Sequence, residues 1–353
     1  MRPVHGGNLA WAAAIAGCPP DAILDFSASI SPLGPPRSAI AAIQATLGNL
    51  IYYPDPDYRE LKAALGQLHQ LPPQWILPGN GSAELLTWAG WDLAKLAATA
   101  LLTPAFGDYY RCLKAFDAKV IEFPLNLETR EDSLLPLASD KCGLLLNNPH
   151  NPTGKLFLRE IILPYLEQFA LVVVDEAFMD FLPPHQEQSL IPLVQEYPNL
   201  VILRSLTKFY SLPGLRLGYA IAHPDRLRRW QQLRDPWTLS TPAAAAAVAV
   251  IQDVEFQQQT WAWLPEARSQ LFQKLAQLPG LQPLESAANF LLVESQLPSS
   301  QLQQQLLKND QILIRDCLSF PQLGDRYFRV AVRSSEDNER LLEALSTIIN
   351  AKS

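Results

Sequence analysis

The 353-residue sequence contains little of what metal centres and disulfide-bonded proteins require. It has five histidines and four widely scattered cysteines, Cys18, Cys112, Cys142 and Cys317. No Cys-x-x-Cys pair occurs, and no histidine stands at ligand spacing from a cysteine. The sequence therefore predicts neither a metal site nor a disulfide framework, and it favours reduced thiols.

Charge and long apolar runs are also scarce. Charged residues make up 18% of the chain, the formal net charge is −7, and there is no long basic run, which disfavours nucleic acid as a partner. No apolar run approaches the roughly 18 residues of a membrane span, and no long apolar segment follows basic residues at the N-terminus. We expect a cytoplasmic protein that binds neither membrane nor nucleic acid.

What the chain does contain is an alternation of short apolar runs and helical patterns. The apolar runs predict strands at 100–102, 119–123, 143–146, 171–174, 201–203 and 219–222. Helical periodicity covers 82–96 and 57–68, the second with Asp57 as its N-cap. This order predicts an α/β fold whose mostly parallel central sheet is covered by helices on both faces.

The pattern changes after about residue 250, which predicts more than one domain. Gln-rich helices precede strands at 289–293, 311–314 and 327–332, and a last helix starts near Ser334 with a capping signal. We expect a large domain at 46–250 and a smaller C-terminal α/β domain at 251–353. The Pro-rich segment 1–45 is expected to be irregular and to pack on the small domain and the active site.

The most informative segment is 205–218, where one lysine stands among hydroxyl groups. Lys208 follows Ser205 and Thr207, and Arg216 comes eight residues later. An amine able to form an imine, next to groups that hold a phosphate, is the combination that pyridoxal 5′-phosphate (PLP) requires. A surface lysine in a loop is the plainer interpretation, and the surrounding residues disfavour it.

Two further polar residues follow predicted strands. Asp175 comes directly after three valines, at the carboxyl end of a buried strand, where α/β sheets bind ligands. Its carboxylate is expected to pair with the pyridine nitrogen of PLP. Asn151 opens an Asn-Pro-Thr-Gly turn after the strand at 143–146 and is expected to donate to the ring hydroxyl. Alone, each residue is explained by a helix cap or a common turn; together with Lys208 they indicate a cofactor site.

A glycine-rich turn at 79–83 precedes the helical pattern of 82–96. The backbone N–H groups of Gly81, Ser82 and Ala83 are expected to face the cofactor phosphate, because a helix N-terminus favours anions. Ser205, Thr207 and Arg216 complete this predicted phosphate site. Phe106, in a loop after the strand at 100–102, is the candidate to stack on the cofactor ring, with ordinary packing as the alternative.

Arginines near the C-terminus are candidates for substrate anions. In the strand pattern of 327–333, Arg329 and Arg333 fall on one face because the period of a strand is two. Two guanidinium groups on one face suit a carboxylate or a phosphate. Arg315 is a third candidate. Surface salt bridges remain the alternative for Arg315 and Arg333.

These residues together resemble the fold-type I PLP-dependent enzymes, the aspartate aminotransferase superfamily. Residues 52–56, 147–154 and 175–178 resemble the histidinol-phosphate aminotransferase branch. The segments 5–8, 25–36 and 327–333 are similar to those of the L-threonine-O-3-phosphate decarboxylases of cobalamin biosynthesis.

The resemblance implies a homodimer with shared active sites, in which Tyr53 reaches the partner's cofactor phosphate. It also implies that Arg329 binds the substrate carboxylate and that His5 lies near the substrate phosphate, although a disordered tail is the plainer interpretation for His5. Arg315 and Arg333 remain candidates for a substrate anion from their residue type and position, and Asn151 is a further candidate for a substrate contact.

Three residues depart from the family pattern. Phe178 stands where aminotransferases commonly have a tyrosine that donates to the ring hydroxyl. Ser29 and Ser31 stand where the decarboxylase pattern has asparagines. These departures concern contacts to the ring and the substrate, and they leave the proposed chemistry unchanged.

The activity that this resemblance implies is PLP-dependent decarboxylation of a phosphorylated amino acid, L-threonine O-3-phosphate. The products are (R)-1-amino-2-propanol O-2-phosphate and CO₂. The alternative is a histidinol-phosphate or related aminotransferase. A non-catalytic binder with this fold is a third alternative, which the presence of Lys208, Asp175 and Asn151 together disfavours.

Overall fold

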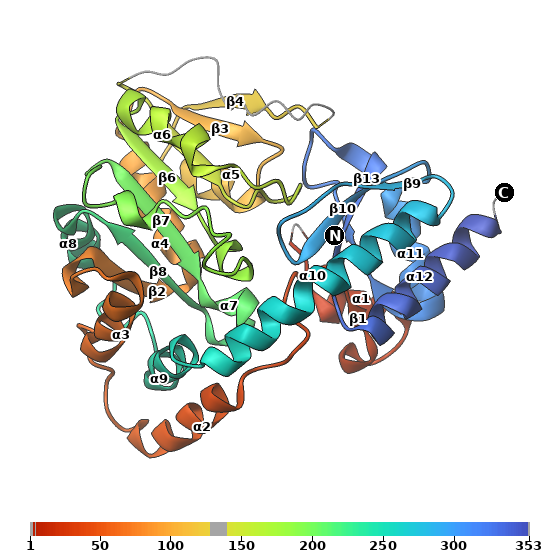
Figure 1. Ribbon diagram of the computed structural model, residues 1–353, viewed down its shortest axis with the longest axis horizontal. Coiled ribbons are helices and arrows are strands. Elements are labelled where there is room, and N and C mark those ends of the chain that lie inside the picture. The colour runs from red at the N-terminus through yellow and green to blue at the C-terminus, as the bar shows by residue number, and fades with distance from the viewer. Residues whose placement is uncertain (1–2, 4, 128–139, 352–353) are drawn as a thin grey trace.

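The computed structural model describes residues 3, 5–127 and 140–351, which form three sheets. The largest has seven strands in the order β2-β8-β7-β6-β5-β3-β4 (Figure 1). These are β2 (Ile76–Asn80), β3 (Thr99–Thr103), β4 (Val120–Pro124), β5 (Gly143–Asn147), β6 (Leu171–Asp175), β7 (Leu200–Ser205) and β8 (Leu217–Ala222). β8 is antiparallel to both β2 and β7, and the other neighbouring strands of this sheet pair in parallel. The predicted mostly parallel sheet is confirmed, and β2 is a strand that the sequence did not reveal.

Alternation along the buried strands fills both faces of this sheet. Leu144 and Leu146 belong to one hydrophobic core and Leu145 to another, because successive side chains of a strand point to opposite faces. One face is covered by α4 (Gly81–Leu93), α5 (Gly107–Lys114) and α8 (Pro224–Leu233). The other is covered by α3 (Arg59–His69), α6 (Arg159–Gln168) and α9 (Thr241–Ile251). The sheet is therefore a buried middle layer, as predicted.

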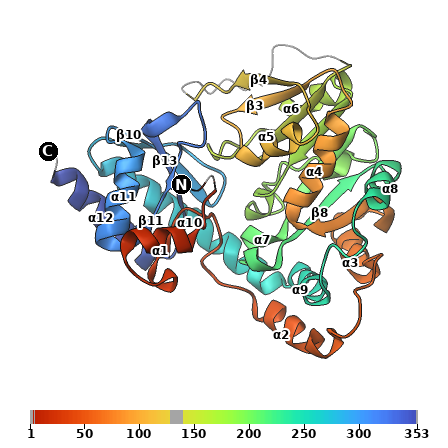
Figure 2. The same ribbon diagram turned by 180° about the vertical axis from the view of Figure 1, so that it is seen from behind.

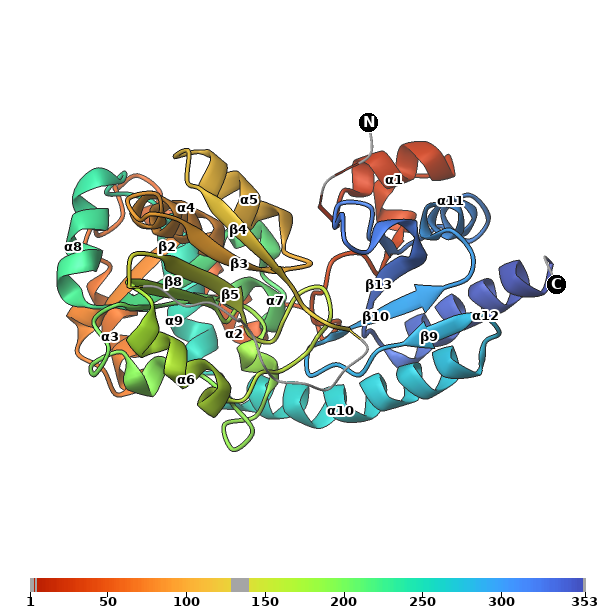
Figure 3. The ribbon, with the colours of Figure 1, turned by 90° about the horizontal axis from the view of Figure 1, so that it is seen from above.

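A long helix, α10 (Val254–Gln277), leads from the large sheet to a four-stranded antiparallel sheet (Figure 3). Its order is β12-β13-β10-β9, built from β9 (Leu281–Pro283), β10 (Phe290–Ser295), β12 (Arg315–Asp316) and β13 (Tyr327–Ala331). The same C-terminal part of the chain contains the helices α11 (Ser299–Asp310) and α12 (Ser335–Asn350). The Ser334 side chain accepts a hydrogen bond from Asp337 N at 3.1 Å, which confirms the predicted cap.

The N-terminal segment is more regular than the sequence suggested. It contains α1 (Leu9–Ala16), β1 (Leu24–Asp25) and α2 (Arg37–Thr46), so the expectation of an irregular chain is wrong for these stretches. β1 pairs in parallel with β11 (Ile312–Leu313), and α1 packs on α11. α2 instead packs on α9, beside the large sheet (Figure 2). The three domain ranges themselves stay a prediction.

The start of α3 corrects one predicted cap. The helix begins at Arg59, and Tyr58 before it is left-handed with φ 49°. The Asp55 carboxylate accepts hydrogen bonds from Arg59 N and Asp57 N, both at 3.1 Å. Asp57 is therefore not the N-cap, because the chain turns around Asp55 two residues earlier.

Short helical turns complete the described chain. They are η1 (Pro20–Ala22), η2 (Leu47–Asn49), η3 (Pro73–Trp75), η4 (Met179–Phe181), η5 (Ile191–Leu193), η6 (Pro213–Leu215), η7 (Gly324–Arg326) and α7 (Leu206–Phe209). Within the described ranges, no helix has the length and apolar character needed to cross a bilayer. The same residues contain no group of three or more His, Cys, Asp or Glu that could hold a metal ion.

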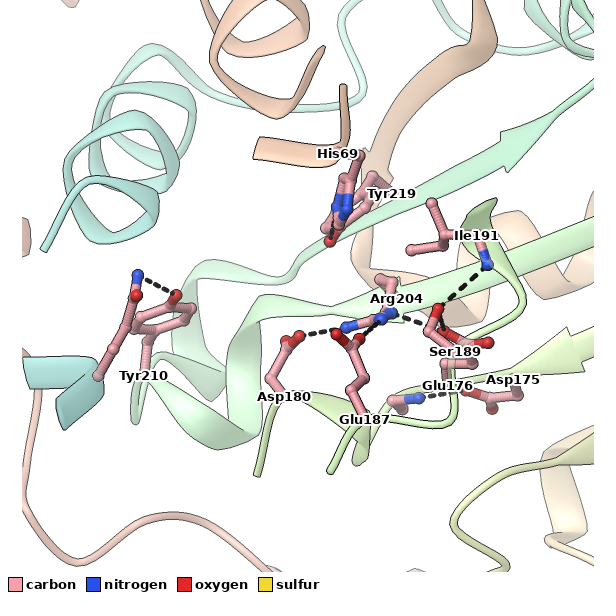
Figure 4. A network of polar contacts seen from close by, with 12 residues as sticks. His69, Asp175, Glu176, Asp180, Glu187, Ser189, Ile191, Arg204, Tyr210 and Tyr219 are labelled. Carbon is pink, nitrogen blue, oxygen red and sulfur yellow. Dashed lines mark hydrogen bonds and ion pairs between the residues drawn. The ribbon is translucent and has the colours of Figure 1, made fainter. Parts of the chain in front are cut away.

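A buried arginine joins β7 to the segment that follows β6 (Figure 4). Arg204 is 2% exposed, and its guanidinium group contacts the carboxylates of Glu176, Asp180 and Glu187. Glu176 also accepts hydrogen bonds from Ser189 Oγ at 2.6 Å and from Leu190 N at 2.9 Å. The segment that continues from Asp175 is thus fixed to the neighbouring strand by charge-assisted hydrogen bonds.

Replacing this arginine by an apolar residue of similar length should destabilise the fold. Arg204→Met leaves buried carboxylates without their counterion, at a cost of about 3–5 kcal/mol. Burial raises the pKa of Glu176 and of Asp180, and Arg204 opposes this rise. Without Arg204 the two pKa values rise further, so the folded state binds protons more tightly than the unfolded state. The loss should therefore shrink as the pH falls from about 7.5 to about 5.5.

The measurement is the unfolding midpoint of both proteins at the two pH values. Arg228→Met is the matched control, because Arg228 and its partner Asp225 each have 65% side-chain exposure, and it should change stability by less than about 1 kcal/mol. An equal loss for both variants, or a loss that grows at acidic pH, would contradict this account of the cluster.

Candidate active site

The predicted site residues meet where β5, β6 and β7 end. Asp175 is the last residue of β6 and pairs in register with Asn147 of β5 and Leu203 of β7. Lys208 lies in α7, which follows β7 directly. Because parallel strands present their carboxyl ends at one edge of the sheet, the carboxylate and the amine reach the same place.

The Lys208 amine lies in a partly closed and polar environment. Its Nζ donates to Ser205 Oγ at 3.4 Å and lies 5.0 Å from the ring centroid of Phe178. Burial lowers the pKa of Lys208; the negative charge of Asp175 opposes this, and the positive charges of Arg216 and Arg329 add to it. A lysine with a lowered pKa gives up its proton readily, which suits a nucleophile and a proton carrier.

Asp175 is held by two hydrogen bonds. Its Oδ2 accepts from the Tyr109 hydroxyl at 2.9 Å, and its Oδ1 accepts from Ala177 N at 3.0 Å. Burial raises the pKa of Asp175, whereas the positive charge of Lys208 and the two hydrogen bonds lower it. Each carboxylate oxygen keeps a lone pair that can accept from a cationic partner.

The turn before α4 forms a cradle of backbone N–H groups. Gly81 starts the helix at φ +76°, and a Cβ atom there would lie 2.6 Å from Arg216 Nη2. A Cβ on Gly218 would lie 2.4 Å from Ser82 N. These close approaches bring the helix N-terminus and a guanidinium group together, the arrangement that binds a phosphate.

Two hydroxyl groups of the predicted phosphate site also converge. Ser205 Oγ and Thr207 Oγ1 lie 2.8 Å apart, at the junction of β7 and α7. Ser205 pairs in register with Gly218, and Gly218 pairs with Gly79 on β2. The strand pairing therefore places the hydroxyls beside the turn that contains Gly81, Ser82 and Ala83.

A second group of cations lies on the small sheet. Arg329 of β13 is buried, and its Nη1 donates to Asn151 Oδ1 at 2.5 Å and its Nη2 to Ser27 O at 3.2 Å. Within the described chain its Nε has no hydrogen-bond partner. Burial, and then the positive charge of Arg315, lowers the pKa of Arg329 to about 10. A buried guanidinium group held by neutral oxygens is prepared to bind an anion.

Arg315 of β12 pairs in register with Arg329. It donates to Pro3 O at 3.5 Å and to Ser319 Oγ. A small cavity of about 10 Å³ beside it is also lined by His5 and Ser27. Burial lowers the pKa of His5; Asp108 opposes this, and Arg315 adds to it. The structure thus brings together His5 and Arg315, which the sequence gave separately as candidate substrate contacts, and their contact with the substrate stays a prediction.

Arg333 has different neighbours. β13 ends at Ala331, two residues before it. Its Nε pairs with Asp337 at 3.0 Å, and its Nη1 donates to Asp25 O at 3.1 Å. These contacts join the start of α12 to β1, so the structure favours the salt-bridge alternative, and a substrate contact for Arg333 stays a prediction.

The N-terminal loop packs against the lysine segment. Ser31 N donates to Lys208 O at 3.0 Å, and Ser211 Oγ donates to Ser31 O at 2.7 Å. Ser29 is 5% exposed, and its hydroxyl has no partner among the described residues. The two serines that depart from the decarboxylase pattern therefore lie in the loop that borders Lys208.

Two aromatic candidates lie at the edges of the site. Phe106 precedes α5, with its ring centroid 5.5 Å from that of His5 and 5.7 Å from that of Tyr109. Tyr53 is 78% exposed and stacks on Trp237 at 4.5 Å between ring centroids. Stacking of Phe106 on the cofactor, and contact of Tyr53 with a partner subunit, stay predictions.

The described residues fit PLP. An amine with a lowered pKa, a buried acid beside it, and an N–H cradle with an arginine occupy three sides of one site. Phe178 lies beside the lysine and offers a ring without a hydroxyl.

A family model described as "Aminotransferase class I and II" matches residues 21–345. The chain belongs to this family. It is 40% identical to the threonine-phosphate decarboxylase of Salmonella typhimurium, over 99% of this chain and 97% of that protein. It is 34% identical to a histidinol-phosphate aminotransferase of Symbiobacterium thermophilum, over 90% of this chain and 88% of that protein.

Solved structures agree with this membership of the aminotransferase family. The histidinol-phosphate aminotransferase of Clostridium acetobutylicum superposes with a TM-score of 0.83 at 26% identity, covering 93% of this chain and all of that one. The predicted fold-type I architecture is thereby confirmed.

One residue of this family member's site was not predicted from the sequence. Tyr109 is 1% exposed and contacts Asp175, which is 66 residues further along the chain. Its only signal in the sequence is its position three residues after Phe106, which places both at the start of α5, about one helical turn apart.

In this aminotransferase-family site, Gly218→Ala should weaken binding of the cofactor phosphate. The added methyl group meets Ser82 N at 2.4 Å and displaces the first turn of α4. We expect the dissociation constant for PLP to rise at least about tenfold, from the loss of one to two charge-assisted hydrogen bonds.

Binding of pyridoxal, which lacks the phosphate, should change little. Gly214→Ala is the control, because a Cβ at Gly214 meets no atom within 4 Å. Fluorescence titration of the cofactor-free proteins measures both ligands. Equal weakening for PLP and pyridoxal would show that Gly218 serves the fold and not the phosphate site.

Proposed function

We propose that this protein binds PLP through Lys208 and decarboxylates L-threonine O-3-phosphate to (R)-1-amino-2-propanol O-2-phosphate and CO₂, in cobalamin biosynthesis in the cytoplasm. The observation that carries the proposal is the 40% identity to a threonine-phosphate decarboxylase over 99% of the chain. The two buried cations Arg315 and Arg329 support it, because the substrate carries both a phosphate and a carboxylate.

When bound, PLP supplies the electron sink that accepts the electron pair released from the carbon–carboxylate bond. The Asp175 carboxylate would pair with the ring nitrogen; burial raises its pKa, whereas the charge of Lys208 and its two hydrogen bonds favour the ionised form. Lys208 would hold the cofactor, and its side-chain amine, next to Ser205 Oγ, would carry the proton that Cα receives when CO₂ leaves. Burial lowers the pKa of Lys208, which makes that proton easier to transfer.

The small-sheet arginines orient the substrate. Arg329, held by Asn151 and Ser27, faces the carboxylate, while Arg315 and His5 bind the phosphate. The loop that carries Ser29 and Ser31 closes the side next to Lys208 and keeps water away from Cα. These residues therefore bind both ends of the substrate while the reacting carbon lies at the lysine.

A histidinol-phosphate aminotransferase is the second candidate, favoured by the 34% identical relative. Histidinol phosphate has an amine and a phosphate but no carboxylate. It would therefore leave Arg329, which is held by neutral oxygens, without a carboxylate to bind until the second substrate entered, so it matches this site less well.

One assay separates the two candidates. PLP-loaded protein receives L-threonine O-3-phosphate alone, and in a parallel reaction histidinol phosphate with 2-oxoglutarate. We expect CO₂ release in the first reaction without any amino acceptor, and no glutamate in the second. Lys208→Ala should abolish CO₂ release and the cofactor adduct that borohydride fixes on this residue, whereas Lys155→Ala should retain both.

Glutamate formation without CO₂ release would make the protein an aminotransferase. A borohydride-stable adduct on another lysine would refute the assignment of Lys208.

We also propose that the protein is a homodimer and that Tyr53 contributes to the partner's phosphate site. The loop before α3 and its surroundings expose apolar side chains that a monomer would leave in water: Leu47 52%, Leu50 61%, Ile51 79%, Tyr52 68%, Tyr53 78% and Trp237 44%. A contiguous set of this kind indicates a contact with another protein. The family resemblance implies that this other protein is a second copy of the same chain.

Ile51→Asp should shift the protein from dimer to monomer, because it places a charge in this apolar surface. Sedimentation velocity at micromolar concentration measures the change. Leu158→Asp, at a residue 46% exposed on another part of the surface, should remain dimeric. A wild-type monomer would refute the dimer, and a dimeric Ile51→Asp would place its interface elsewhere.

A further inference from the structure

Tyr109 is a buried tyrosine whose hydroxyl group reaches the acid of the proposed cofactor site. It lies on α5, with its side chain between that helix and the sheet, in the same core as Leu145 and Val173. Its hydroxyl donates to Asp175 Oδ2 at 2.9 Å. Packing alone would be satisfied by phenylalanine, so the hydroxyl group requires a separate explanation.

Phe106, the residue predicted to cover the cofactor ring, directly precedes α5. Tyr109 N donates to Phe106 O at 3.0 Å, and the two rings meet edge to face at 5.7 Å. Asp175 receives its second hydrogen bond from the other side, from Ala177 N. One hydrogen bond from α5 and one from the segment that follows Asp175 therefore hold the carboxylate, and together they fix the orientation of its plane.

The state of the hydroxyl group follows from its surroundings. Burial raises the pKa of Tyr109 well above its ordinary value, and the negative charge of Asp175 raises it further. Tyr109 is therefore always a donor, and a donor favours the ionised form of the acid it contacts. Burial acts on Asp175 in the opposite direction.

We propose that Tyr109 is a positioning residue which holds Asp175 ionised and oriented toward the ring nitrogen of the cofactor, so that the hydroxyl group contributes to cofactor binding through the acid. This inference depends on the proposed binding of PLP and goes beyond it, because it assigns a role to a residue that does not itself bind the ring.

Tyr109→Phe tests the inference, since it removes one oxygen and keeps the packed ring. The dissociation constant of cofactor-free protein for PLP should rise about tenfold, the effect of losing one hydrogen bond to a charged group. Tyr110→Phe is the matched control. Tyr110 is the next residue of α5, and its hydroxyl donates to Glu122 at 2.8 Å, so its loss should leave the dissociation constant within about twofold.

A cofactor analogue distinguishes positioning from a structural role. In 1-deaza-pyridoxal phosphate a CH group replaces the ring nitrogen, so Asp175 has no partner there. Tyr109→Phe should leave the affinity for this analogue unchanged or make it tighter, because the acid can then take up a proton. Weakening of PLP and of the analogue by the same factor would overturn the inference.

A double-mutant cycle gives a second measurement that does not use the analogue. In an Asp175→Asn background, Tyr109→Phe should cause less than about a twofold further change in PLP affinity, because the acid through which it acts is gone. A full tenfold change in that background would also overturn the inference, on the scale of one charged hydrogen bond. If the wild-type protein failed to bind PLP, the proposed function itself would fall, and this outcome is distinct from a variant that binds as well as the wild type.

Discussion

The rest of the site depends on burying an acid and an amine at adjacent strand ends. Asp175 and Lys208 each lose water, and burial alone would neutralise both. Each charge stabilises the charged form of the other, and the remaining contacts hold these two groups in place. Tyr109 and Ala177 N hold the carboxylate, whereas Ser205 accepts from the amine. The parallel register of β6 and β7 is what brings the two segments within reach.

Acidic and basic side chains lie on different sides of the Asp175–Lys208 pair. Behind it, the acids on the 176–187 segment surround Arg204 and fix the chain that follows Asp175. On the ligand side lie Arg216 near the α4 turn and Arg329 on the small sheet. A chain of net charge −7 therefore presents cations where anionic groups are proposed to bind. The overall charge disfavoured nucleic acid as a partner, but it said nothing about this local field.

The sequence predicted what is encoded locally and missed what depends on contacts in space. Apolar runs located β3 to β8, and a glycine turn before a helix located the N–H cradle. Tyr109 was missed because its contact spans 66 residues. Asp57 was predicted as the N-cap, but it is Asp55 that accepts the hydrogen bond from Arg59 N. The two acids stand only two residues apart, and the sequence did not distinguish them. The period-two argument did not foresee that Arg333, two residues beyond the end of β13, pairs with Asp337, and its contact with the substrate stays a prediction.

The pairing of Arg315 with Arg329 carries an electrostatic cost for the folded state. Two guanidinium groups on neighbouring strands repel each other, and burial penalises both. A stable core would place a carboxylate between them, yet the hydrogen bonds of Arg329 in the described chain go to an amide oxygen and a backbone carbonyl. An anion bound there, as proposed, would offset both costs and would bind the folded state alone, so ligand binding and folding stability would be coupled. The electrostatic cost therefore lies at the proposed substrate end of the site, whereas the Arg204 cluster fixes the segment that follows Asp175.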